Sequence, residues 1–436
     1  MRDRGTDLSR RRRTSILSIC SSARRIVTCS VFPYGSCTLA ASRLCNGVGQ
    51  IVNNKNLASL PVTAYEDALA DIREDRSVRE KLDVIHREVN AHYPFVDRIA
   101  VAIYESERDL LKTFVYSCGI PSPLQFYQTT LRSSDSLSEI AATGRARVVN
   151  DLSIFDNVRK LHSERIGKTG YGSSYTVPFY SDGTFAGLIF ANSYQTNVFT
   201  DSVCHGLSPF AHLIGLLVLR EMDLVRILYR SVSSALDISH HRDPETGAHL
   251  DRMSRYARII ANELAPRHDL DDEYVEFIYR FAPLHDVGKI AIPDRILLKP
   301  GRLDEEEYRE MQTHARKGRE IMDRMLANFR LEGLQHIGIL RNIIEFHHEA
   351  IDGSGYPDGL SGDAVPLEAR IITVADIFDA LTSARPYKSA WSNDDAFAEL
   401  KRISGSKVDP RCVDALMKHR PLIEEIQRTF QDAPVG

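Results

Sequence analysis

Apolar and polar positions alternate with two different periods in the first half of the chain. From about Val78, apolar residues at Leu82, Ile85 and Val89 recur at helical spacing and predict a helix. The segment RIAVAIYE from Arg98 is rich in β-branched residues, and the pattern predicts a strand over residues 98–104. A second strand is predicted at residues 113–117. This half of the chain therefore mixes helices and strands.

A hairpin signal follows further along the same half. Residues 174–178 and the apolar stretch 185–191 flank Ser181-Asp182-Gly183, a turn sequence typical of two antiparallel strands. A helix is predicted near residues 137–143. Helix, strands, a further helix, a hairpin and a closing helix together predict an α+β domain of about 140 residues, the size of a small sensor unit.

The second half of the chain is helical by its pattern. Residues 213–236 are apolar at helical intervals and contain no proline, which predicts a connecting helix. From residue 242 to about residue 420 the pattern stays helical, and glycine and proline mark the few turns. The fold class is therefore multidomain, an α+β domain followed by an all-α domain. The predicted boundaries are 1–60 for a tail, 61–212 for the first domain, 213–236 for the connecting helix and 237–425 for the helical domain.

Charge is distributed unevenly along the 436 residues, although the net charge is only -4. The first 60 residues carry many basic and only two acidic side chains: Arg2, Arg4, Arg10, Arg11, Arg12, Arg13, Arg24, Arg25, Arg43 and Lys55 against Asp3 and Asp7. We interpret this tail as a disordered, solvated extension. Contact with nucleic acid or an anionic membrane, or a translation start placed too early, are the alternatives that the tail leaves open.

Hydropathy and cysteine spacing indicate the cellular compartment. The longest apolar run, around residues 213–219, is interrupted by Arg220 and Glu221, so we expect no membrane span. The spacing of the seven cysteines fits neither a close-paired zinc site nor a compact disulfide framework. We expect a cytoplasmic protein with reduced thiols, and no nucleic acid polymer as a partner.

Residue types that bind metals accumulate in the helical domain. The adjacent pair His347-His348 opens the run HHEAIDGSGYP, and His285 and Asp286 are adjacent within LHDVGKIAIPD. An adjacent His-Asp pair can give a nitrogen to one ion and a carboxylate that bridges to a second. The full candidate set is Glu245, His249, His285, Asp286, His314, His347, His348 and Asp376. Mixed imidazole and carboxylate ligands favour first-row ions such as iron, manganese or zinc over calcium.

Taken in order, LHDVGK, the later His314, HHEAIDGSGYP and VADIFDALTSARPYK resemble the HD-GYP domain, a branch of the HD phosphohydrolases. The resemblance covers about residues 235–420. It implies that the eight candidate ligands bind two or three divalent ions, typically Fe or Mn, and Glu245 favours the three-metal version. The implied substrate is cyclic di-GMP, and the implied product is linear pGpG, with GMP in some members of the family.

The same resemblance implies further roles for individual residues. Lys289, Arg385 and Lys388 match positions that face substrate phosphates, whereas Asp243, Gly355 and Tyr356 match positions near the bound nucleotide. Within this scheme His285, Asp286 and Lys289 are the catalytic residues. Independently of the family, Gly353 and Gly355 permit a backbone path that β-carbons would obstruct, and this path places Tyr356 at the edge of a pocket.

The order of elements in residues 61–212 resembles a GAF domain. The supporting residues are SLSEIAATGRARVVNDL (136–152), the pair Val177-Pro178 and the glycines Gly183 and Gly187. This resemblance implies that a small molecule of unknown identity binds the first domain and regulates hydrolysis through the connecting helix. We expect a homodimer through that helix. A cyclic di-GMP-binding adaptor without activity, or an HD phosphohydrolase of another cyclic nucleotide, are the alternative functions.

Overall fold

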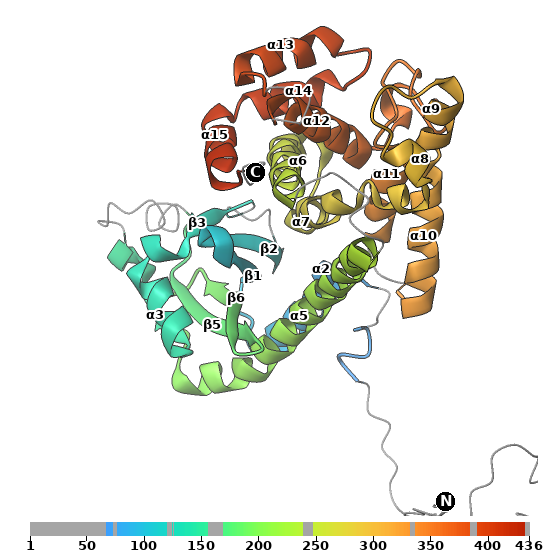
Figure 1. The fold of residues 1–436 in the computed structure, drawn as a ribbon. Helices are drawn as coiled ribbons and strands as arrows, with labels where there is room; N and C mark the ends of the chain where they lie inside the picture. Colours follow the sequence, from blue (N-terminus) through green and yellow to red (C-terminus); the bar gives the residue numbers. More distant parts are fainter. Residues whose placement is uncertain are drawn as a thin grey trace, which may run out of the picture. The chain divides into compact units, whose positions relative to one another are not determined.

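A six-stranded antiparallel sheet forms the centre of the N-terminal part of the structure (Figure 1). The strand order is β3-β2-β1-β6-β5-β4, so the central strands β1 and β6 come from opposite ends of the domain. The strands are β1 (Arg98–Glu105), β2 (Leu110–Cys118), β3 (Gln128–Thr130), β4 (Arg147–Val149), β5 (Ser173–Ser181) and β6 (Thr184–Ser193). The computed structural model describes residues 67–72, 76–119, 124, 126–155, 169–238, 247–331, 336–383 and 390–431.

The first helix confirms the predicted start near Val78. Helix α2 (Val78–His92) begins after Ser77, whose side chain accepts a hydrogen bond from the backbone N–H of Glu80. The Glu80 carboxylate accepts in return from the backbone N–H of Ser77, which completes a capping box. Short 3-10 turns follow between the strands: η2 (Ser106–Arg108), η3 (Leu131–Ser133) and η4 (Leu152–Phe155).

The predicted hairpin is the β5–β6 pair. Its turn places Asp182 at φ 49° and Gly183 at φ 77°, both in the left-handed region, which Asp and Gly adopt more readily than other residues. The turn thereby fixes a register in which Ser181 pairs with Thr184 and Ser173 with Ser193. Alternate residues of both strands consequently face the same core.

Two helices cover one face of the sheet and a third helix covers the other. Ile85 and Val89 of α2, together with Ile214 of helix α5 (Asp201–Ile238), pack against Val101 and Phe114 of the sheet. On the opposite face, Leu137 and Ile140 of helix α3 (Asp135–Thr143) pack against Leu111 and Leu188. The α+β prediction for this region is confirmed.

Helix α5 is longer than the connecting helix that the sequence predicted. It begins at Asp201 instead of Leu213, and it contains Pro209 in its first turns. Leu207 and Ile214 belong to the core of the sheet domain, whereas Val225 and Leu228 belong to the core of the helices that follow.

The stretch Asp201–Val232 is long and apolar enough to cross a membrane by length and composition, with 28% of its most apolar window buried in the structure. The sequence predicts no membrane span, whereas this helix meets a criterion of length and composition for one. The charges at Arg220 and Glu221 are too few to take the stretch below it. One such helix is weak evidence for a span, because the core helix of a soluble protein meets the same criterion.

The described residues after α5 form helices and loops, as predicted. The α-helices are α6 (Gly247–His268), α7 (Asp272–Phe281), α8 (Asp294–Leu297), α9 (Glu305–Gln312), α10 (His314–Phe329), α11 (Ile337–Phe346), α12 (Leu367–Thr382), α13 (Asn393–Ile403), α14 (Pro410–Met417) and α15 (Arg420–Thr429). The 3-10 turns are η5 (Ala282–Leu284), η6 (Val287–Ala291) and η7 (Gly362–Ala364). The last helix extends beyond the boundary predicted at residue 425.

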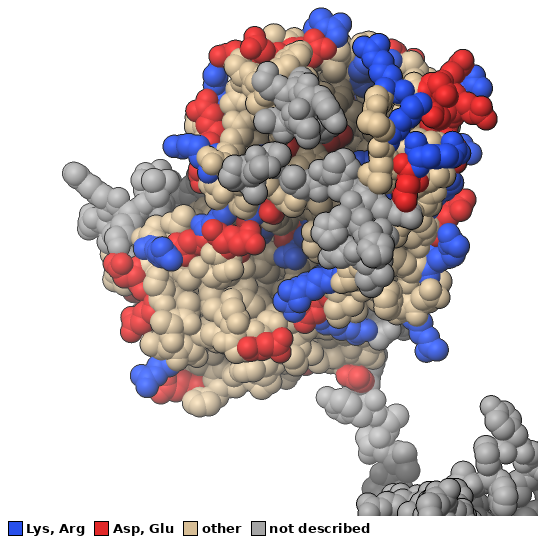
Figure 2. All heavy atoms as spheres, viewed as in Figure 1, with Lys and Arg blue, Asp and Glu red and all other residues tan. Residues whose placement is uncertain are grey.

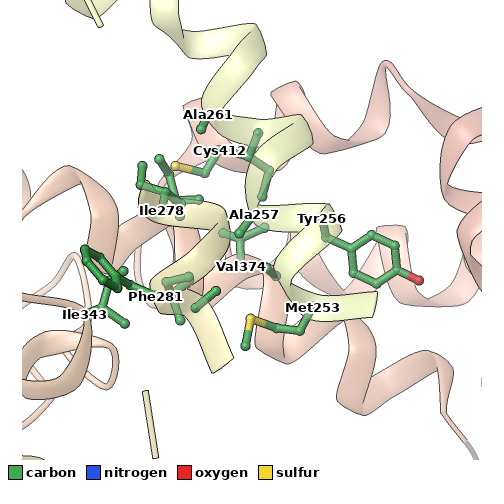
Figure 3. Close-up of a cluster of buried hydrophobic side chains, with 14 of the residues drawn as sticks. Met253, Tyr256, Ala257, Ala261, Ile278, Phe281, Ile343, Val374 and Cys412 are labelled. Carbon is green, nitrogen blue, oxygen red and sulfur yellow. The ribbon is translucent and has the colours of Figure 1, made fainter. Parts of the chain in front are cut away.

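Helix α6 lies at the centre of the helical core. Met253, Tyr256 and Ala257 on this helix are fully buried, and they lie among side chains of the neighbouring helices such as Ile278 and Val374 (Figure 3). Residues from Asp67 onward form one compact unit. On the face drawn in Figure 2, basic side chains are interspersed with acidic ones.

Several predictions concern residues outside the described ranges. These are the tail at 1–60 with its four cysteines, and the site candidates Asp243, Glu245, Arg385 and Lys388. Among the described residues, Cys204 and Cys412 are free thiols.

Candidate metal centre

Seven of the eight predicted ligands lie together in the helical domain. Most of them lie at the ends of helices, where the chain turns: His285 follows η5, His314 opens α10, and His347 with His348 follows α11. His249 lies in the first turn of α6 and Asp376 in the middle of α12. Helices distant in sequence therefore direct their ligand-bearing positions to one place.

The seven side chains form two groups that could each hold a metal ion. The first comprises Asp286, His314, His347 and His348, and the second comprises His249, His285 and Asp376; within each group the ligand atoms lie within 4.8 Å of one another. The Asp286 carboxylate faces both groups. Its Oδ1 lies 3.1 Å from Nε2 of His314, and its Oδ2 lies 3.2 Å from Nε2 of His285. This geometry is the one required of a carboxylate that bridges two ions.

Hydrogen bonds to Nδ1 fix the orientation of four of the imidazoles. In His285, His314 and His347, Nδ1 lies within 3.0, 2.8 and 3.0 Å of the backbone oxygens of Ala282, Met311 and Ile343. In His249, Nδ1 lies 2.8 Å from Oδ2 of Asp379. An acceptor at Nδ1 requires the proton there, so Nε2 carries the lone pair that a metal needs. All four Nε2 atoms are buried.

Burial favours the neutral form of the adjacent imidazoles His347 and His348. Burial lowers the pKa of both His347 and His348, and the neighbouring His347 lowers the pKa of His348 further. Burial opposes ionisation of Asp286, but Lys289 and His285 outweigh it and hold the pKa of Asp286 well below its ordinary value. A neutral imidazole at His347 and His348 and an ionised carboxylate at Asp286 are the protonation states in which these residues bind metal. The donor set therefore fits the divalent ions that the sequence predicted.

The Gly-Tyr-Pro loop closes over one side of the first group. The ring of Tyr356 lies 4.7 Å from the ring of His348, centroid to centroid. A Cβ at Gly355 would lie 2.3 Å from the backbone nitrogen of Ala350, so only glycine permits the approach. Gly353 has φ 79°, in the left-handed region. Both glycine assignments made from the sequence are therefore confirmed by the backbone.

Glu349 anchors this loop, and the sequence did not single it out. Its carboxylate is buried and accepts hydrogen bonds from the backbone N–H groups of Asp358, Gly359 and Leu360 at 2.7, 3.1 and 3.0 Å. Its position directly after the histidine pair was the available signal. From the sequence alone, a glutamate at this position could equally be another metal ligand or a solvated side chain. The backbone N–H groups that it binds belong to residues 9 to 11 positions later in the chain.

Asp379 and Arg252 are the other two residues that the sequence analysis missed. Arg252 donates from Nε to Oδ1 of Asp379 at 2.7 Å and from Nη2 to Oδ2 at 2.8 Å. Burial opposes ionisation of Asp379, yet hydrogen bonds from His249 and Arg252 lower its pKa. The signal was the spacing: Arg252 follows His249 by one helical turn, and Asp379 follows Asp376 by one turn.

Lys289 lies at the edge of the cluster. Its Nζ is 2.8 Å from Oδ2 of Asp286, the oxygen that faces His285. The Lys289 ammonium group is therefore in direct contact with the carboxylate that faces both ligand groups. The other predicted phosphate contacts, Arg385 and Lys388, lie outside the described residues, as do Asp243 and Glu245.

The ligand groups lie within a stretch of the chain that is similar to known proteins. Residues 244–412 match the HD domain family model. The cyclic di-GMP phosphodiesterase response regulator RpfG of Xanthomonas campestris pv. campestris is 50% identical over 193 residues, which are 44% of this chain and 48% of that protein. The 3'3'-cGAMP-specific phosphodiesterase 2 of Vibrio cholerae is 41% identical over 41% of this chain and 32% of that protein. The chain thus spans about half or less of the length of these relatives.

The N-terminal part is similar to solved structures of another kind. The phycocyanobilin-bound GAF domain of a cyanobacterial phytochrome covers 35% of this chain with 90% of its own length, at 12% identity and a TM-score of 0.29.

Proposed function

Because residues 244–412 form an HD domain, we propose that this chain is a metal-dependent phosphodiesterase that hydrolyses cyclic di-GMP to pGpG. The observation that supports this most strongly is Asp286, whose two oxygens face His314 in one ligand group and His285 in the other, each ring oriented by a contact at Nδ1. The relative from Xanthomonas campestris, which is a cyclic di-GMP phosphodiesterase, supports the choice of substrate. Hydrolysis of pGpG to GMP is a second step that product analysis would detect.

We propose two or three divalent ions, Fe or Mn, as the cofactors. His314, His347 and His348 would hold one ion, His249, His285 and Asp376 another, and Asp286 would contact both. When bound, such ions neutralise the phosphate oxygens and lower the pKa of water toward neutrality. A third ion would require Glu245.

The protein's own side chains orient the diester in this proposal. Lys289, beside Asp286, is placed to stabilise negative charge on the phosphoryl group. The half-buried ring of Tyr356 beside His348 restricts the pocket and offers a surface against which a base can pack. Arg385 and Lys388 are assigned to the substrate phosphates by family resemblance alone, and Asp243 to the nucleotide.

Regulation by the N-terminal α+β domain is the second part of the proposal. We assign it a GAF-like sensor role with an unidentified small-molecule ligand, and we place the chain in the cytoplasm, where the free thiols fit a reducing compartment. We also propose a homodimer through α5. Leu216 and Ile227 on this helix are exposed by 65% and 50%, which is unusual for large apolar side chains.

Hydrolysis of another cyclic dinucleotide is the alternative that a specific observation favours. The relative from Vibrio cholerae is a 3'3'-cGAMP-specific phosphodiesterase at 41% identity. Rates measured in parallel on cyclic di-GMP and 3'3'-cGAMP would separate the two substrates. Binding of cyclic di-GMP without product, in protein loaded with iron under anaerobic conditions, would instead favour the adaptor alternative.

The decisive experiment combines metal analysis with product identification. Purified protein with Mn²⁺ or Fe²⁺ should linearise cyclic di-GMP, and the double variant His285→Ala with Asp286→Ala should abolish the reaction. His205→Ala is the matched control, because His205 is exposed and its Nδ1 contacts the oxygen of Asp201 in its own helix. Full activity in the double variant would refute the metal assignment.

A further inference from the structure

The side chain of His249 is oriented by Asp379, which in turn is fixed by residues that do not belong to either ligand group. Asp379 is fully buried, and its Oδ2 lies 2.8 Å from Nδ1 of His249. The Ser383 hydroxyl donates to the same carboxylate oxygen at 3.0 Å. A carboxylate fixed in this way sets both the tautomer and the ring orientation of its histidine.

Arg252 connects this carboxylate to the C-terminal end of the described chain. Beyond its two hydrogen bonds to Asp379, its Nη1 donates to the backbone oxygen of Phe430 at 2.8 Å. Phe430 follows α15 and donates its own N–H to the oxygen of Ile426 at 2.9 Å. Arg252 is only 4% exposed, so this hydrogen bond to the Phe430 carbonyl is made by a buried guanidinium.

The ring of Phe430 continues the series of contacts. The guanidinium carbon of Arg255 lies 3.7 Å from the centroid of that ring, within the range of a cation–π interaction. Arg255 is 1% exposed, and it donates from Nη2 to Oε2 of Glu107 at 2.9 Å. Glu107 lies in η2, the turn that joins β1 to β2.

A continuous series of contacts thus runs from the β1–β2 turn through Arg255, Phe430, Arg252 and Asp379 to His249. Both arginines lie on α6, one turn apart, and Phe430 contacts the two of them with different atoms. Neither a surface ion pair nor a local helix contact explains why a C-terminal aromatic residue packs there, because both arginines are buried.

We propose that Phe430 and Arg255 are positioning residues for the metal ligand His249, and that they couple the β1–β2 turn of the N-terminal domain to the affinity of the His249, His285 and Asp376 group for its ion. The inference rests on the proposed function, because it takes this group to be a metal site. It adds a route by which a change at the sheet reaches the site.

The test measures Mn²⁺ affinity in the full chain by competition with a chromophoric chelator, and it records thermal unfolding without metal. Phe430→Leu removes the ring under Arg255 but keeps the backbone carbonyl, and it should weaken binding about 3- to 10-fold. Phe430→Tyr keeps the ring and should bind as the wild type does. Glu424→Gln, on the exposed side of α15, is the control for changes in that helix and should also leave affinity unchanged.

The same measurements in an Asp379→Asn variant distinguish coupling through Asp379 from a general loss of structure. Asp379→Asn should weaken Mn²⁺ binding about 10- to 100-fold, the usual cost of losing an outer partner of a metal-binding histidine. In that background Phe430→Leu should cost nothing more, because the series of contacts is already broken. Glu107→Gln should likewise add little to Phe430→Leu, because both changes act on Arg255.

The outcomes distinguish this inference from the proposed function. If the wild type binds Mn²⁺ and hydrolyses cyclic di-GMP while Phe430→Leu binds Mn²⁺ equally well, the coupling is refuted and the enzyme assignment stands. An equal loss from Phe430→Leu with and without Asp379→Asn would also refute it. A wild-type chain that binds no divalent ion would overturn both proposals.

Discussion

Buried carboxylates in this protein have opposite protonation behaviour, and each follows from its neighbours. Asp286 and Asp379 are buried beside cations or hydrogen-bond donors, which lower their pKa values. Asp272 is 6% exposed, and its carboxylate accepts a backbone hydrogen bond from Phe126 at 2.8 Å. Burial therefore dominates there and raises the pKa of Asp272 from 3.8 to about 8.

The raised pKa of Asp272 predicts a pH dependence of stability. A carboxyl whose pKa is higher in the folded state stabilises the fold fully below its unfolded pKa of 3.8, and this contribution is lost as pH rises through about 8. Asp272→Asn keeps an acceptor oxygen but cannot ionise, so its free energy of unfolding should fall less than that of the wild type between pH 5 and pH 9. Urea unfolding at several pH values measures this. Parallel profiles for the two proteins would show that Asp272 is ionised in the fold.

Glu349 gives a second prediction at the residue scale. Glu349→Gln replaces a buried acceptor of three backbone hydrogen bonds with an amide that presents N–H groups to N–H groups. We expect the free energy of unfolding to fall by about 1.5–3 kcal/mol and KM for the nucleotide to rise, with metal content retained. Glu345→Gln removes a partly exposed partner of Arg319 and serves as the control. An unchanged KM would show that the loop does not shape the pocket.

The residues that the sequence could reveal are those whose chemistry shows without a partner. A histidine pair, an adjacent His-Asp pair and glycines in a loop are recognisable in isolation. Seven of the eight metal ligands predicted from the sequence lie together in the structure. Asp379 and Glu349 act through partners that the linear sequence does not identify. An aspartate on a helix reads as solvated until His249, 130 positions away, is placed beside it.

At the scale of elements, the close approach of η6 to α10 brings the two parts of the first ligand group together. A Cβ on Gly288 would lie 1.9 Å from the backbone oxygen of His314 and 2.6 Å from the nitrogen of Gly318. Backbone atoms cannot move aside as a flexible side chain can. Glycine at position 288 thus sets the distance between Asp286 and His314.

Gly288→Ala should separate these elements. We expect a loss of about 1–3 kcal/mol in the free energy of unfolding, as for other overpacked sites, together with weaker Mn²⁺ binding. Gly338→Ala in α11 is the matched control, because nothing lies within 4 Å of the added Cβ and alanine favours a helix. Chemical unfolding and metal titration of both variants provide the comparison. Equal stability of the two alanine variants would contradict the packing argument.

How well a helix or strand can be predicted from the sequence depends on its length and on the residues in the adjoining turn. The hairpin was predictable because Asp182-Gly183 suits its turn, and β1 because eight residues display a pattern. Strands β3 and β4 have three residues each, too few to show an alternation. The predicted connecting helix begins at Leu213 because the stretch from there on contains no proline, whereas α5 begins at Asp201 and continues through Pro209, with Leu207 packed in the core of the sheet domain.

At the scale of the whole molecule, buried ion pairs join the sheet to the helices. Nζ of Lys112 on β2 lies 2.7 Å from Oε2 of Glu276 on α7, and both side chains are largely buried. Burial dominates the environment of Lys112 and lowers its pKa to about 8. Arg258 on α6 pairs with Glu105 on β1 at 2.8 Å. Glu105 pairs with both Lys112 and Arg258, and Lys112 also pairs with Glu276, so the four charges form one network between the sheet and the helices.

Lys112→Met should therefore destabilise the whole compact unit. It keeps most of the side chain's volume but leaves Glu276 and Glu105 with one cation fewer, and breaking a buried pair in this way costs about 3–5 kcal/mol. Glu399→Gln breaks an exposed pair with Arg402 and should leave stability unchanged. Calorimetry of both variants tests this, and a wild-type melting temperature for Lys112→Met would show that the contact contributes nothing.

Helix α5 has a consequence for how such proteins are recombined. Val225, Leu228 and Val232 contribute to the core that surrounds α6, while Leu207 and Val218 contribute to the core under the sheet, and Met222 packs against both. Consider a chimera in which the N-terminal part, up to the end of α5, comes from a different protein. Three residues in the core of the helical domain, Val225, Leu228 and Val232, would then be replaced. A crossover at Met222 leaves each interior with its own residues. The boundary between the two hydrophobic cores thus lies in the middle of a helix.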